Sequence, residues 1–97
     1  MFIISLTYIK PIEEIDALLE SHSRYLQEEY AKGNFIASGR KVPRTGGIIL
    51  SQIQEQEKIK EIIQRDPFYQ AGVAEYEIIQ FTPSMVADGF ENLKPNP

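Results

Sequence analysis

The stretch FIISLTYI, residues 2–9, is rich in β-branched and aromatic side chains, which is typical of a β-strand. Pro11 should end this strand, because proline has no backbone N–H to donate to a neighbouring strand. The apolar residues that follow are three or four positions apart, which predicts a helix with one buried stripe. The stripe consists of Ile12, Ile15, Leu18, Leu19, His22, Leu26 and Tyr30, and Gly33 ends the helix.

The rest of the chain repeats this order of strand and helix after a hairpin. Residues 34–39 (NFIASG) and 46–53 (GGIILSQI) predict two strands, joined by a turn that contains Pro43. Residues 55–65 predict a second helix, and residues 73–81 predict a last strand. This order predicts an α+β fold of ferredoxin-like βαββαβ topology, with two helices on one face of an antiparallel four-stranded sheet.

Length and composition indicate one domain over residues 1–97. The chain is 42% hydrophobic and 25% charged, which is the balance of a soluble globular protein. The segment from about residue 82 onward holds three prolines and few apolar residues. We expect it to form an irregular tail on this domain.

Charge and residue types narrow the classes of function. The net charge is −4 and the ten Lys and Arg residues are scattered, so no nucleic-acid partner is expected. Apolar runs such as residues 48–50 are far too short to span a membrane. With no cysteine and no signal-peptide pattern, a cytoplasmic location is expected. A single histidine and the lack of a phosphate or dinucleotide motif predict neither a metal nor a cofactor.

The predicted strands carry apolar residues on both faces. Ile3 alternates with Ile4 in the first strand, and Ile48 and Leu50 alternate with Ile49 in the third. Two helices can cover only one face, and monomers rarely tolerate a large exposed apolar patch on the other. Packing two sheets face to face about a two-fold axis would cover it. We therefore predict a homodimer, a dimeric α+β barrel, and the sequence leaves open whether dimers associate further.

His22 is the only histidine and lies on the apolar stripe of the first helix, so its ring should point toward the sheet. One interpretation is a buried structural histidine whose two nitrogens are both hydrogen-bonded. The other is a residue that transfers protons in a cleft between the sheet and the helices. The pattern of residues by itself leaves both open.

Asp66 follows Ile62 and Ile63 at helical spacing and precedes Pro67, so it should end the second helix on its inward side. Asp before Pro also caps a new helical turn, with Asp as the N-cap residue. A cap uses one carboxylate oxygen, and the other could face His22, because both helices lie on the same face of the sheet. Such a pair could transfer protons, and capping alone is the alternative.

Five further residues are candidates for binding a substrate: Tyr8, Ser38, Gly39, Arg40 and Phe68. The glycine would let a ligand approach the backbone closely, or it serves only the turn. Arg40 belongs to a small basic cluster with Lys41 and Arg44, which could hold an anionic group or be a solvated loop. The two aromatic residues could line a pocket or belong to the core.

The segments HSRYL, FIASG, GGIIL and DPFYQAGVAEYEIIQF, in this order, resemble the YciI-like or YCII-related family over most of the chain. The resemblance implies a dimeric α+β barrel of ferredoxin-like topology and a His–Asp pair that falls on His22 and Asp66. The chain departs from the family pattern at Arg40, where many members have proline. It departs again at Leu18 and Leu19, where many have an arginine.

One relative in this family is a dehydrochlorinase of a chlorinated hydroxyhydroquinone, and the wider superfamily includes muconolactone isomerase. The resemblance therefore implies elimination or isomerisation of a small organic molecule, anionic or aromatic, without a cofactor. Two alternatives stay open: a protein that binds a small molecule without catalysis, and a purely structural homodimer.

Overall fold

The computed structural model describes residues 1–95, so the last two residues of the predicted tail lie outside the described part. Strands and helices follow in the order β1 (Phe2–Tyr8), α1 (Ile12–Ala17), α2 (Leu19–Ala31), β2 (Ala37–Arg40), β3 (Gly46–Ser51), α3 (Gln56–Gln64), α4 (Pro67–Gln70) and β4 (Ala74–Gln80), and a 3-10 turn spans Glu91–Leu93. The sheet order is β2-β3-β1-β4 and every neighbouring pair is antiparallel. The predicted ferredoxin-like topology is confirmed.

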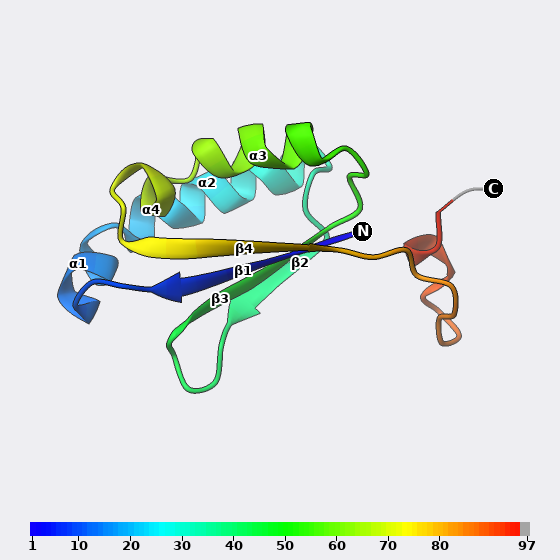
Figure 1. The fold of residues 1–97 in the computed structure, drawn as a ribbon, viewed down its shortest axis with the longest axis horizontal. Helices are drawn as coiled ribbons and strands as arrows, with labels where there is room; N and C mark the ends of the chain where they lie inside the picture. Colours follow the sequence, from blue (N-terminus) through cyan, green and yellow to red (C-terminus); the bar gives the residue numbers. More distant parts are fainter. Residues whose placement is uncertain (96–97) are drawn as a thin grey trace.

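The helices α2, α3 and α4 lie on one side of the sheet, and the other side is uncovered (Figure 1). Phe2, Ile4 and Leu6 of β1 point toward the helices and are at most 2% exposed. On α3, the residues Ile59 and Ile62 are equally buried and face this strand layer. Burying each of these side chains contributes about 1.5–3 kcal/mol, so the central strand and α3 form the main part of the core.

The predicted helix of residues 12–30 is divided into two at Leu18. The Leu18 N–H donates to the Ile15 carbonyl at 3.0 Å, three residues back, which tightens the last turn of α1 and shifts the helical register. The predicted apolar stripe is therefore right for Ile15, Leu18, His22 and Leu26, which pack inward, and wrong for its other three members. Its members Ile12, Leu19 and Tyr30 are more than one-third exposed, and the buried positions of α2 are Tyr25 and Glu29.

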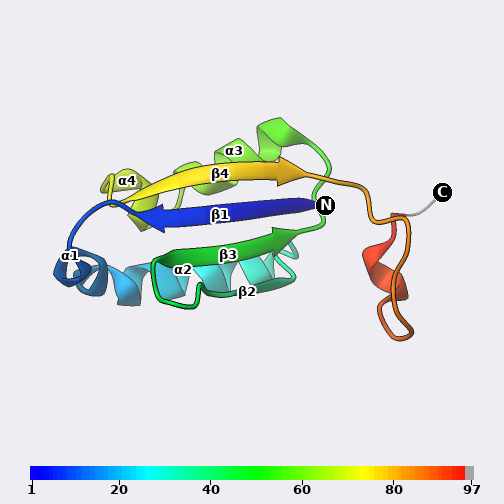
Figure 2. The same ribbon diagram turned by 60° about the horizontal axis from the view of Figure 1, so that its bottom comes forward.

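The uncovered face of the sheet is apolar in its centre. The register pairs Ile3 of β1 with Leu50 of β3 and with Ile79 of β4, and places Ile48 beside them on the same face. These side chains are half-buried or exposed in the single chain. Beyond β4 the chain runs away from the sheet as the C-terminal segment, coloured orange to red in Figures 1 and 2. Within residues 1–95, no helix combines the length and hydropathy needed to cross a membrane.

Candidate functional site

His22 and Asp66 meet between the helices. Nδ1 of His22, on α2, lies 2.8 Å from Oδ1 of Asp66, which stands between α3 and α4. The imidazole side chain is 14% exposed and the carboxylate side chain 1% exposed. The predicted contact between the two residues is present, and the carboxylate is the member sealed from water.

Local sequence explains why Asp66 is held so firmly. It is the N-cap residue of α4 with extended dihedral angles, and Pro67 occupies the first helical position. Its Oδ1 accepts the backbone N–H of Phe68 at 2.9 Å. Asp66 therefore caps α4 and also contacts His22.

The two carboxylate oxygens of Asp66 accept different hydrogen bonds from those predicted. The expectation was that one oxygen caps the helix and the other faces His22. Instead, Oδ1 accepts both of those hydrogen bonds, and Oδ2 accepts the hydroxyl of Tyr76 on β4 at 2.6 Å. Burial and the Asp66 charge raise the pKa of Tyr76, so this phenol stays protonated and can only donate to the carboxylate.

Tyr76 was not predicted as a site residue. The alternation of residues along β4 does indicate that Tyr76 faces the helices, together with Ala74 and Ile78. Tyr76 is paired with Leu6 of β1. The alternation predicts burial, and a buried tyrosine hydroxyl needs a hydrogen-bond partner. It does not say that the partner is Asp66, because the partner comes from a different element.

The buried carboxylate of Asp66, which already accepts from Phe68 and Tyr76, determines the tautomer of the neutral His22 ring. A carboxylate without a proton accepts only, so the hydrogen between it and the ring belongs to Nδ1 of His22. In the neutral form of the ring, the other nitrogen, Nε2, then carries the lone pair. His22 also stacks on Phe68, with ring centroids 4.0 Å apart and planes at 7°, which fixes the orientation of the ring.

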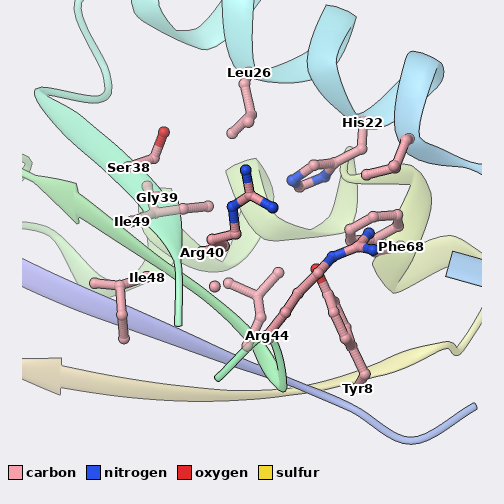
Figure 3. A pocket seen from close by; sticks show the side chains of 14 residues that line it. Tyr8, His22, Leu26, Ser38, Gly39, Arg40, Arg44, Ile48, Ile49 and Phe68 are labelled. Carbon is pink, nitrogen blue, oxygen red and sulfur yellow. The ribbon is translucent and has the colours of Figure 1, made fainter. Parts of the chain in front are cut away.

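A pocket of about 380 Å³ opens beside this pair, between the sheet and α2 (Figure 3). It is lined by Leu6, Tyr8, Leu19, His22, Leu26, Ser38, Gly39, Arg40, Arg44, Gly46, Gly47, Ile48, Ile49 and Phe68. All five candidate substrate-binding residues and His22 therefore line one cavity. Asp66 does not line it and is 0% exposed, so it can act only through His22.

Apart from His22 and Tyr8, the polar side chains of the pocket come from β2 and the loop after it. Ser38 Oγ lies 2.7 Å from the hydroxyl of Tyr30, and an added Cβ at Gly39 would meet nothing within 4 Å. Arg44 donates to Asp16 on α1 at 2.8 Å. Lys41, the third member of the predicted basic cluster, does not line the pocket and donates to Thr7 instead.

A part-buried ion pair also joins α2, which carries His22, to the end of α3, next to Asp66. Glu29 is 1% exposed, and both of its carboxylate oxygens accept from Nη2 of Arg65, at 2.6 and 3.0 Å. Asn34 donates to the same carboxylate at 3.0 Å. Since Glu29 lies on the helix of His22 and Arg65 precedes Asp66, this contact fixes the distance between the helices near the site. The sequence reasoning missed it, because Glu29 has the pattern of a surface residue.

The described part of the chain contains no cluster of side chains that could serve as metal ligands. Among residues 1–95, no group of three or more His, Cys, Asp or Glu side chains is close enough to hold an ion.

Comparisons with known proteins agree with this architecture. The model of the YCII-related domain matches residues 1–82. The fold is similar to that of 5-chloro-2-hydroxyhydroquinone dehydrochlorinase (TftG) from Burkholderia phenoliruptrix AC1100, solved in complex with 2,5-dihydroxybenzoquinone. The two share 15% sequence identity with a TM-score of 0.70, over 84% of this chain and 94% of that chain. Among curated proteins none matches the sequence. Since the family model covers most of its length, the chain belongs to the YCII-related family.

Proposed function

We propose that this protein is a cofactor-free acid/base enzyme that acts on a small organic molecule by elimination or isomerisation. The observation that carries the proposal is the geometry of His22, whose Nδ1 is held by a buried carboxylate while the ring lines an open pocket. Nε2 is then free to take a proton from a bound substrate. Asp66 is a positioning residue, which orients the imidazole and stabilises its protonated form.

Each reaction class makes a defined demand on the pocket. In an elimination, Nε2 takes a proton from carbon, the C–H electron pair forms the new double bond, and the leaving group departs with its own electron pair. In an isomerisation, His22 returns the proton to a different atom. Tyr8 and Phe68 supply apolar walls for the substrate, while Ser38, the Gly39 backbone and Arg40 supply polar contacts. The elimination that gives the dehydrochlorinase TftG its name supports the first class as the one to test first.

Hydrogen exchange tests this proposal even when the reaction product has not been identified. The protein is incubated in D₂O with 2,5-dihydroxybenzoquinone and with a panel of small cyclic hydroxy acids, lactones and hydroquinones, and carbon-bound hydrogens are followed by NMR. We expect the wild-type protein to exchange at least one C–H position, and His22→Gln to leave that position unexchanged. Ligands that bind without any exchange or turnover would contradict the enzyme proposal and leave a small-molecule-binding protein.

We also propose that two copies associate through the uncovered face of the sheet. Leu50 lies at its centre, paired with Ile3 and with Ala37 of the edge strand. An apolar face of this kind is the usual site of a symmetric contact.

Leu50→Glu should therefore convert a dimer into a monomer, because a charge at the centre of the apolar contact cannot be buried without a partner. Size-exclusion chromatography with light scattering measures the mass. Ile12→Glu on α1 is the matched control, since Ile12 is apolar and 39% exposed but lies away from the sheet. A monomeric wild-type protein, or a Leu50→Glu variant that keeps the mass of a dimer, would reject this interface.

A further inference from the structure

The pocket beside His22 is positively charged although the protein as a whole is negative. Its lining includes two arginines, Arg40 and Arg44, and no aspartate or glutamate. The whole chain has a net charge of −4. A cavity lined by one sign of charge with apolar walls attracts ligands of the opposite sign.

The two arginines are not equivalent. Arg44 is already paired, because its Nη2 donates to Asp16 at 2.8 Å and its guanidinium stands 5.9 Å from the ring centre of Tyr8. Its charge is therefore compensated within the protein, and its side chain forms part of the wall. A ligand that used Arg44 would have to compete with Asp16.

Arg40 is the uncompensated cation. Within residues 1–95 it makes no side-chain hydrogen bond and no ion pair, and it extends from the end of β2 into the pocket. Figure 3 shows its guanidinium pointing toward the imidazole of His22. A planar guanidinium is suited to bidentate contact with a carboxylate or a similar planar anion.

The remaining residues of the pocket wall indicate the size and polarity of the rest of the ligand. Leu6, Leu26 and Ile49 are apolar, and Phe68 presents an aromatic side chain stacked on His22. An apolar cavity of about 150 Å³ is enough for a benzene ring. The volume of about 380 Å³ therefore leaves room for one ring with small substituents.

We propose that the substrate of this pocket is a small cyclic or aromatic molecule with a single negative group, which Arg40 holds while the apolar body lies against Tyr8 and Leu26, beside His22. This inference rests on the proposed function for the identity of the reacting group. The inference goes beyond the proposed function because it assigns one negative charge to the substrate and names Arg40 as the residue that binds this charge.

Benzoate and benzamide are the probes for this assignment, because they have nearly the same shape and differ in charge. His22 is the only histidine, so its Cε1–H signal can be followed by NMR without overlap as each probe is added. We expect benzoate to move this signal and to bind about fivefold more tightly than benzamide, as suits a charged contact that water still reaches. Arg40→Gln should bring the affinity for benzoate down to that for benzamide.

Lys41→Gln is the matched control. It removes the same charge from the neighbouring residue, whose amino group donates to Thr7 and does not line the pocket. We expect this variant to keep the preference for benzoate. Circular dichroism and thermal unfolding should confirm that Arg40→Gln is folded.

Three results would overturn the inference: no binding of benzoate up to its solubility limit, equal affinities for benzoate and benzamide, or a preference for benzoate that survives Arg40→Gln. None of these readouts needs turnover. If the protein exchanges hydrogen on a neutral substrate but shows no preference for benzoate, the proposed acid/base function stands and the assignment of a negative group is wrong. If the protein prefers benzoate but exchanges hydrogen on no substrate, the charge assignment stands and the proposed acid/base function is wrong.

Discussion

His22→Gln will lower kcat by about 10²- to 10⁴-fold on a substrate found by hydrogen exchange, which is the range that one general acid/base contributes. Glutamine fills a similar volume and can still donate to Asp66, but it has no nitrogen that binds and releases a proton near neutral pH. The stack on Phe68 is lost with the ring, so circular dichroism and thermal unfolding should confirm that the variant is folded.

Asp66→Asn tests the same pair from the other side and should reduce kcat to a similar extent. The amide retains the shape and can still accept the Phe68 N–H, but it has no negative charge to stabilise a protonated imidazole. It also no longer dictates which ring nitrogen carries the hydrogen; loss of that control in a serine protease triad costs about 10⁴-fold. The ¹⁵N chemical shifts of His22 report the tautomer directly.

Asp88→Asn is the control for this substitution, because Asp88 is an exposed residue of the C-terminal segment. It should leave kcat and the His22 shifts unchanged. If His22→Gln and Asp66→Asn both turn over substrate at the wild-type rate, the pair has no part in catalysis.

Arg65→Met should lower the free energy of unfolding by about 3–5 kcal/mol, because it leaves the carboxylate of Glu29 buried without its main partner. The Glu29 side chain is only 1% exposed in the folded protein. Glu29→Gln should cost only about 1–3 kcal/mol, because the Arg65 side chain that it leaves is 45% exposed and can turn into solvent. Urea unfolding measures both values.

Lys32→Met is the control for the loss of a positive charge near Glu29. Lys32 lies 3.7 Å from the carboxylate and is 54% exposed, so its removal should change the free energy of unfolding by no more than about 1 kcal/mol. If Glu29→Gln proves more costly than Arg65→Met, the asymmetry in burial does not govern the energy of this ion pair.

The same contact should make stability depend on pH. Burial of Glu29 opposes its ionisation, but hydrogen bonds from Arg65 and Asn34 outweigh burial and hold the pKa of Glu29 below its ordinary value of 4.5. A depressed pKa means that the stabilisation is fully present above pH 4.5 and is lost as the pH falls through the pKa of the folded state. The loss of stability between neutral and acid pH should therefore be smaller in Glu29→Gln than in the wild-type protein.

Much of the fold follows from local patterns. Alternation in β1 and β3, the three-or-four spacing in α3, and the turn residues between β2 and β3 each predict the element that forms there. Two boundaries were predicted wrongly: the strand expected over residues 34–39 forms over Ala37–Arg40, and the helix expected over residues 12–30 divides at Leu18. The division was not predicted because no proline or glycine marks it in the sequence. A tightened final turn needs neither.

The candidate site was predictable to the extent that its residues have local roles. Asp66 is recognisable because Pro67 follows it, and His22 because it interrupts an apolar spacing. Tyr76 and Glu29 were missed, since each looks ordinary in its own strand or helix. What distinguishes them is a hydrogen-bond partner from another part of the chain.

By itself, then, the sequence determined the order of the elements and the capped turn at Asp66, because periodicity and capping act over a few neighbouring residues. Only the tertiary structure decided that one oxygen of Asp66 serves both the cap and His22, and that Tyr76 contacts the other oxygen. It also decided that Arg44 is paired with Asp16, while Arg40 has no partner among residues 1–95. These outcomes depend on how helices and strands that are distant in the sequence pack together. The spacing of residues within one element does not determine which side chains of other elements it will contact.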